Sequence, residues 1–282
     1  MAIIYQNEYE TKLQERLSEE NKWKIFCNVE YTDVQVLHNP YLTDVTANTG
    51  TRGSAYTPEA VTTTDDTVTI NTFKVAAQYI DRADMAQKTF KGWMDLADNQ
   101  GLVLNEAIET AMFANHAEYT DFDNASIGGA AGNITVSESN VDDIIRGVKR
   151  EIREANGEAL MDRNGVAFFW RPADFEKLES YAQAQGMSSA DYVLVNGTKQ
   201  GFRYMGAEHF SSNKMTSGHL LAGVKKVLHL GICKSTYGQV VTNSDPVVSG
   251  GQISGVGIVS RVDFKFKAWA KIAPVLFDIL VA

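Results

Sequence analysis

The residues best suited to metal or nucleophilic chemistry are five histidines and two cysteines, because imidazole and thiolate groups are common zinc ligands. They are His38, His116, His209, His219, His229, Cys27 and Cys233. Zinc-binding motifs place two such ligands within a few residues of each other. No two of these residues have that spacing in the sequence, so each histidine is expected to be an ordinary surface or core residue. The cysteines are expected to be buried free thiols in a reducing compartment.

Two segments resemble known binding motifs in part, but each lacks residues or structure that its motif requires. Asp121-Phe122-Asp123-Asn124 begins like a calcium loop, but Ala125 stands at its third ligand position and Gly132 at the place of its final glutamate. Gly255-Val256-Gly257 is similar to a dinucleotide-binding turn, but a strand is predicted after it, where the motif needs a helix N-terminus. We therefore expect no catalytic, cofactor-binding or metal-binding residues, and a structural protein rather than an enzyme.

The charge and composition argue against several classes of protein. A net charge of −9 opposes tight nucleic-acid binding, which needs clustered lysine and arginine side chains to neutralise phosphates. No apolar run approaches the roughly 20 residues that a membrane-spanning helix needs. The short apolar run 2–4 is too small for a secretory signal. The chain is therefore expected to be made in the cytoplasm and to have no membrane partner.

The N-terminal quarter of the chain predicts structure that cannot form a core of its own. Residues 5–25 have the pattern of a polar helix with a narrow apolar stripe, which must dock on its own domain or on a neighbouring subunit. Residues 28–73 show no helical period, and eleven threonines fall between Thr43 and Thr72. Threonine favours extended structure. We therefore expect a β-hairpin that turns at Asp65-Asp66.

Two helices are expected before residue 120. The first covers residues 82–94, and a longer one follows over 96–118. On the longer helix, Leu104, Ile108 and Met112 recur every four residues, so this face is expected to be buried.

The next part of the chain predicts a helix, a strand and another helix. The first of these helices is capped by Ser139 and Asp142. Its apolar face comprises Val141, Ile144, Ile145, Val148 and Ile152. A short buried strand is predicted at Val166–Trp170, and Pro172 begins a fourth helix that Gly186 ends. Further strands are expected near residues 192–195, 207–210 and 219–222.

The strongest pattern lies near the C-terminal end. Apolar and charged residues alternate there: Val262, Phe264, Phe266 and Ala268 between Arg261, Asp263, Lys265 and Lys267. Such alternation predicts a strand with one buried and one exposed face. Because the apolar residues continue past Trp269 to Phe277, one long strand is expected to close the fold.

The order of these elements resembles that of the major capsid proteins of tailed bacteriophages, which have the Hong Kong 97-type (HK97-like) fold. Three segments carry most of the resemblance. They are the strand and helix from Val166 to Leu178, the strand from Gly206 to Asn213 and the closing strand from Val262 to Pro274. The resemblance implies an α+β capsid fold with an N-terminal arm, an extended β-hairpin loop, a peripheral domain with a spine helix, and an axial domain.

The resemblance also implies boundaries and partners. The parts are an arm over 1–50, an extended loop over 51–76, a peripheral domain over 77–136 and 223–282, and an axial domain over 137–222. Such subunits form pentamers and hexamers of an icosahedral shell around packaged double-stranded DNA. A separate scaffolding protein, a portal and a decoration protein are further implied partners. The expected location is the virion capsid, after assembly in the host cytoplasm.

Two other functions are compatible with the sequence. An encapsulin-type bacterial nanocompartment shell shares the implied fold and would enclose an enzyme cargo in place of a genome. A hydrolase with dispersed catalytic residues is the alternative from a different class. Shell size and contents separate the first from a capsid, and a persistent monomer with hydrolytic activity would favour the second.

Overall fold

The computed structural model describes residues 22–44, 47, 49–53, 55, 58–81, 91–184, 202–234, 239–243, 247–248, 251–252 and 255–282. The predicted helix over 5–25 is therefore described only as α2 (Lys22–Phe26). Most of the predicted helix over 82–94, the strand near 192–195 and the helix end at Gly186 lie outside these residues. None of the helices in the described ranges is long and apolar enough to span a membrane.

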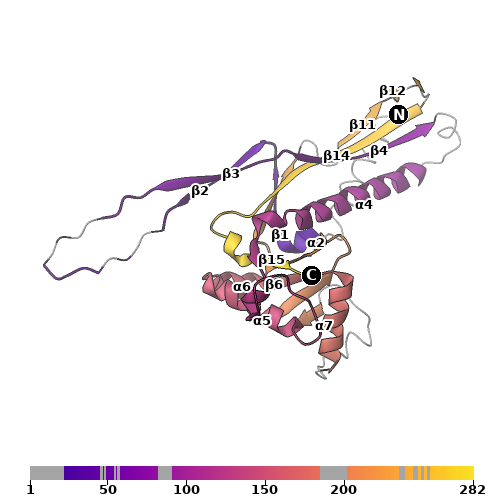
Figure 1. Cartoon of the computed structure of the whole chain (residues 1–282). Coiled ribbons are helices and arrows are strands. Elements are labelled where there is room, and N and C mark those ends of the chain that lie inside the picture. The colour runs from indigo at the N-terminus through magenta and orange to yellow at the C-terminus, as the bar shows by residue number, and fades with distance from the viewer. Residues whose placement is uncertain are drawn as a thin grey trace.

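Two sheets form the body of the molecule (Figure 1). The strands of the first are β1 (Cys27–Thr32), β10 (Leu228–Cys233), β14 (Gly255–Lys267), β11 (Gln239–Asn243) and β4 (Thr72–Asp81). In this sheet β1 runs parallel to β10, whereas β14 is antiparallel to each of its three neighbours. The short strands β12 (Val247–Val248) and β13 (Gly251–Gln252) pair with each other.

The second sheet has six strands in the order β5-β15-β9-β6-β8-β7. They are β5 (Thr120–Phe122), β15 (Leu276–Leu280), β9 (His219–Val224), β6 (Val166–Trp170), β8 (Ala207–Ser211) and β7 (Phe202–Tyr204). The strands predicted near 166–170, 207–210 and 219–222 are thus confirmed as β6, β8 and β9. All five residues of β6 are buried, as the apolar run predicts.

One long helix and three shorter ones accompany the sheets. They are α4 (Lys91–Ala114), α5 (Val141–Glu154), α6 (Glu158–Asn164) and α7 (Pro172–Ala184). The described residues also include three 3-10 turns: η1 (His116–Glu118), η2 (Asn124–Ile127) and η3 (Ala273–Val275). Buried side chains from both sheets and the helices form one continuous hydrophobic core.

The long helix α4 begins earlier than the sequence pattern indicates. The expected break between residues 94 and 96 is wrong, because α4 is continuous from Lys91. Neither glycine nor proline interrupts the chain between Trp93 and Gln100, so nothing ends a helix there. The buried face of Leu104, Ile108 and Met112 is confirmed.

Helix α5 has the predicted apolar face but not the predicted cap. All five apolar positions, from Val141 to Ile152, are fully buried. The capping box is wrong: the N-cap residue is Asn140, and its side chain makes no hydrogen bond to the helix. The Asn140 side chain instead accepts a hydrogen bond from the Ser137 backbone N–H and donates one to the Thr135 carbonyl. The Asn140 side chain therefore stabilises the turn before the helix and does not cap the helix.

The predicted closing strand is two strands that belong to different sheets. Its alternation is confirmed, since the four apolar residues from Val262 to Ala268 are buried. The expectation of one continuous strand is wrong: β14 lies in the first sheet and β15 in the second. Backbone N–H groups of the following turn bind the Trp269 carbonyl oxygen at 2.8 Å. Pro274 lies within η3 and has no N–H for a ladder.

The predicted hairpin exists, but it does not turn at the two aspartates. Asp65 and Asp66 lie inside β3 (Thr63–Thr69), which pairs antiparallel with β2 (Val36–Leu42). Residues 43–62 connect the two strands in sequence. The turn prediction is wrong because both carboxylates have partners that keep the chain extended, as described below.

His209 on β8 is a fully buried histidine that the core keeps neutral. The Trp170 indole N–H donates to His209 Nδ1 at 3.0 Å, so the second ring nitrogen, Nε2, carries the proton and donates to the Tyr204 carbonyl at 3.2 Å. Burial lowers the pKa of His209 to about 4. A second proton on the ring would have to bind Nδ1. It would face the Trp170 indole N–H, and Nδ1 could no longer accept the hydrogen bond from that group.

The buried His209 predicts a loss of stability in acid. Below pH ~6.5 the unfolded chain binds a proton that the native core excludes, so the free energy of unfolding falls until pH reaches about 4. The full effect is roughly 3 kcal/mol. Urea unfolding of the unassembled subunit at pH 7 and pH 4.5 should show the loss. His209→Gln, which cannot titrate in this range, should lose less; parallel pH profiles for the two proteins would contradict the prediction.

Candidate functional site: an exposed assembly surface

The most prominent exposed feature is the β2–β3 hairpin, which projects well away from the body (Figure 1). Its register is continuous from the pair Val36 and Thr69 to the pair Leu42 and Thr63. The Thr43 backbone N–H extends the ladder to the Thr62 carbonyl at 3.0 Å. An isolated two-stranded hairpin is only marginally stable in water. This one therefore needs support at its base and along its length.

A small apolar cluster fixes the base of the hairpin to the first sheet. Leu37, Val68 and Ile70 pack with Trp269, and all four side chains are buried. Gly231 on β10 leaves room for them, because a Cβ atom there would lie 2.9 Å from the Leu37 Cδ1 atom. A larger residue at this position would force the Leu37 side chain to shift.

Polar contacts hold the same part of the hairpin against the turn that links β14 to β15. Asp66 accepts a hydrogen bond from the Ala270 backbone N–H at 2.9 Å and lies 3.9 Å from the Lys267 ammonium. Lys271 forms an ion pair with Asp44. Asp65 faces across the hairpin to His38, with 2.6 Å between its carboxylate oxygen and Nδ1. These contacts explain why the aspartates lie in a strand.

The outer part of the hairpin exposes apolar side chains that the body does not cover. Leu42 is 58% exposed and Val61 is 69% exposed. Exposed apolar side chains and unpaired strand edges on a projecting hairpin favour contact with another chain. The hairpin is thus suited to bury itself against a neighbouring molecule.

Further exposed apolar side chains lie on β4 and on α4, two elements that pack beside each other. Phe73 is 58% exposed, and the Arg261 guanidinium lies 4.7 Å from the centre of its ring. Val75 on β4 and Val103 on α4 are each about half exposed. Between the two elements lies an open groove of ≈ 570 Å³, which Lys74, Lys214 and Lys265 help to line. Lys74 faces this groove, whereas Phe73 and Val75 alternate with it along β4 and lie on the opposite face of the strand, so the exposed groups form two separate surfaces.

Three of the five histidines have the ordinary surroundings that the sequence analysis expects. His38 is exposed on the hairpin, and His209 lies in the core. His229 is buried beside the Trp269 ring, and burial lowers its pKa. The two cysteines are free thiols, with Cys27 buried and Cys233 only partly buried.

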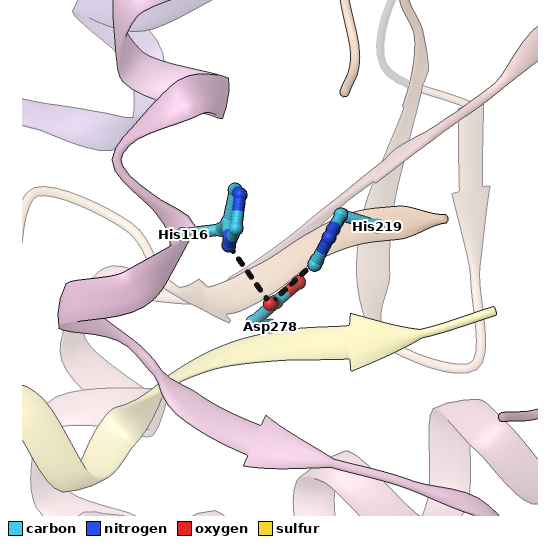
Figure 2. Close-up of side chains that lie close together, drawn as sticks. All are labelled: His116, His219 and Asp278. Atoms are coloured by element: carbon cyan, nitrogen blue, oxygen red, sulfur yellow. Dashed lines mark hydrogen bonds and ion pairs between the residues drawn. The ribbon is translucent and has the colours of Figure 1, made fainter. Parts of the chain in front are cut away.

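The other two histidines meet in space, which the sequence analysis did not predict. His116 and His219 lie around the carboxylate of Asp278 (Figure 2). A distance of 103 residues in sequence separates the histidines, so no local spacing could reveal the cluster. The available signal was Asp278 itself, a lone carboxylate inside the apolar strand β15.

The partial calcium loop and the partial dinucleotide-binding turn both form ordinary secondary structure. Asp123, the third residue of the discarded calcium loop, caps η2 by accepting hydrogen bonds from the backbone N–H groups of Ala125 and Ser126. Gly255-Val256-Gly257 begins the strand β14 and precedes no helix among the described residues.

The described parts combine two sheets, a long helix and a projecting hairpin (Figure 1). No family model matches the sequence, and no curated protein does so. Solved structures match by fold. A structure from Mycobacterium phage Che8 has 13% identity and a TM-score of 0.62, and covers 87% of this chain and 84% of that one.

Two further structures extend the comparison. The mature capsid of bacteriophage PhiM1 has 13% identity and a TM-score of 0.59, covering 90% of this chain and 86% of that chain. A virus-like particle from Pyrococcus furiosus has 10% identity and a TM-score of 0.59, covering 98% and 99%. The chain therefore has the fold of tailed-phage capsid proteins, and the predicted Hong Kong 97-type fold is confirmed. At such identities the likeness concerns the fold alone.

Proposed function

We propose that this chain is the major capsid protein of a tailed double-stranded DNA bacteriophage. It self-assembles into pentamers and hexamers, and these close into an icosahedral shell around the genome. The role is structural rather than catalytic. The subunit resides in the virion capsid after assembly in the host cytoplasm, with a separate scaffolding protein, a portal and a decoration protein as further partners.

The observation that carries this proposal is the projecting hairpin. Its base is fixed by the cluster around Trp269, but Leu42 and Val61 are exposed further out. In a shell these side chains would be buried against a neighbouring subunit, because obligate interfaces between subunits bury about 2,000 Å² or more. The acidic character of the chain supports the same function, since a net charge of −9 favours a wall along which DNA can move without tight binding.

The division into arm, extended loop, peripheral domain and axial domain is part of the proposal. Strand β2 belongs to the predicted arm over 1–50 and pairs with β3 of the predicted loop over 51–76. The six-stranded sheet likewise combines β15 from the predicted peripheral domain with β6 from the predicted axial domain. Strand pairing therefore crosses the proposed boundaries of the arm, loop and domains. These boundaries should be assigned in the assembled shell, from the segments that move as one rigid body.

An encapsulin-type compartment shell is the second candidate function. The observation that favours it is the nearly complete coverage of both chains in the match to the Pyrococcus furiosus virus-like particle. Such a shell would enclose an enzyme cargo. Shells purified from the native source would then contain protein cargo and no genome.

Overexpression followed by electron microscopy tests the proposal. The chain should form closed shells, or pentameric and hexameric rings, alone or when a scaffolding protein is co-expressed. A persistent monomer under both conditions would contradict a shell function, and hydrolytic activity in that monomer would favour the enzyme alternative. If shells form, their diameter and their contents, nucleic acid or protein, separate a capsid from an encapsulin.

A further inference from the structure

His116, His219 and Asp278 form a compact cluster of potential metal ligands (Figure 2). One ligand atom from each residue lies within 4.8 Å of the other two. Asp278 Oδ2 is 2.7 Å from His219 Nδ1 and 3.5 Å from His116 Nδ1. The two imidazole rings are stacked, with 3.8 Å between their centres.

The fold itself brings these residues together. His219 lies opposite Leu280 in the antiparallel pair of β9 and β15, and Asp278 is two residues before Leu280. Side chains two residues apart on a strand point to the same face, so Asp278 and His219 share one face of the sheet. His116 approaches that face from η1, directly after α4. The cluster thus joins the end of the long helix to the six-stranded sheet.

Asp278 provides a second and independent sign of a ligand. The residue is only 2% exposed, and its Oδ1 atom is buried without a hydrogen-bond partner. A buried carboxylate oxygen without a partner costs free energy, and a cation that binds both Oδ1 and Oδ2 would recover it.

The surroundings provide room and access for one ion. A cavity of ≈ 10 Å³ adjoins the three side chains, with Phe113, Tyr119 and Leu221 among its walls. This volume is close to what one water-sized ligand needs. The imidazole side chains of His116 and His219 are 30% and 25% exposed, which leaves a path from solvent.

We propose that His116, His219 and Asp278 bind one divalent transition-metal ion, with zinc as the best match. Two imidazole nitrogens and one carboxylate oxygen form a known zinc ligand set, and a water in the adjoining cavity completes four-fold coordination. Nitrogen ligands disfavour magnesium and calcium, which prefer oxygen. The contact between His219 and Asp278 must open from 2.7 Å to the roughly 3.3 Å that separates two ligands of a tetrahedral zinc ion. The two stacked imidazole rings must also rotate, because a metal binds in the plane of each ring.

Titration of the metal-free, unassembled full-length subunit with Co²⁺ tests the proposal. Co²⁺ in a tetrahedral nitrogen and oxygen site absorbs visible light strongly, so binding is seen directly. One ion per chain is expected, with displacement by Zn²⁺ and none by Mg²⁺. Zinc should also raise the midpoint temperature of unfolding, and a chelator should reverse the rise. The test does not require shell assembly, so it is independent of the proposed capsid function.

Three variants assign the site. Asp278→Asn and His219→Gln should each weaken binding by more than the 10–100-fold typical of losing an outer-shell partner. His116→Gln gives the same test at a half-buried turn position if the buried variants do not fold. His38→Gln is the matched control, because His38 also faces a carboxylate, at 2.6 Å, but in an exposed pair.

The results separate the alternatives. Wild-type binding that survives in His38→Gln and is lost in the cluster variants supports the proposal. Absence of Co²⁺ absorption and of any zinc-dependent rise in unfolding temperature would overturn it and leave the cluster as a hydrogen-bonded His–Asp network. Equal binding by the wild type and the folded cluster variants would also overturn it, by placing the ion elsewhere.

Discussion

Shortening the β2–β3 hairpin is expected to abolish shell assembly while the body of the subunit still folds. Residues 44–61 can be replaced by Asn-Gly, because Thr43 and Thr62 already form a ladder pair at 3.0 Å. A two-residue turn with this sequence closes such a hairpin without strain. The variant keeps β2, β3 and the base around Trp269, including the exposed Leu42, and removes residues 44–61 with the exposed Val61.

Electron microscopy and analytical ultracentrifugation would compare the shortened chain with the wild type. We expect monomers or small oligomers and no closed shells, with an unfolding temperature close to that of the unassembled wild type. Asp44 is lost in the shortened chain, but its partner Lys271 is solvent-accessible, so the cost in stability should be at most about 1 kcal/mol.

A graded control keeps the hairpin at full length. Leu42→Thr with Val61→Thr removes only exposed apolar groups, so assembly should require a higher protein concentration but still occur. Closed shells of wild-type size from the shortened chain would show that the hairpin makes no essential contact. That result would remove the main support for the proposed function.

The parts of the fold that the sequence predicts well are those set by local periodicity. The alternation from Val262 to Ala268 and the helical spacing from Val141 to Ile152 each correspond to a buried face. In both segments, the residues that bury together are near neighbours along the chain. Burial then follows from the period of the backbone alone.

The hairpin shows where local signals mislead. Asp65-Asp66 has the composition of a turn, and Pro40 argues against a strand over 36–42. In the structure Pro40 lies opposite Asp65 in a two-stranded ribbon, where an outward-facing proline costs no ladder bond. Asp66 stays extended because it binds the backbone N–H of Ala270, 204 residues away. A contact at such a separation leaves no trace in local composition.

The cluster of His116, His219 and Asp278 could not be predicted from the sequence for a similar reason. Its residues come from a turn, a strand edge and a buried strand that meet only after the second sheet has formed. Metal motifs with short spacing are visible in a sequence, because one loop or helix holds the ligands. A site built across a sheet has to be found from the register of its strands.

Phe169→Ala is expected to destabilise the subunit by about 3–5 kcal/mol, the usual cost of removing a fully buried aromatic ring. Phe169 on β6 has no exposed surface. Its ring centre lies 5.5 Å from those of Phe26 and Phe113 and 5.3 Å from that of Phe210. These partners belong to α2, α4 and β8, so the cavity would open where the long helix meets the second sheet.

Urea unfolding of the unassembled subunit measures this loss, since assembly would add stability that depends on protein concentration. Phe73→Ala is the matched control: the same side chain is removed at a position that is 58% exposed, beside the Arg261 guanidinium. We expect that variant to lose about 1 kcal/mol or less. Equal losses at the two positions would contradict the placement of Phe169 in the core. An unchanged midpoint for Phe169→Ala would mean that α2, α4 and β8 do not converge on this ring.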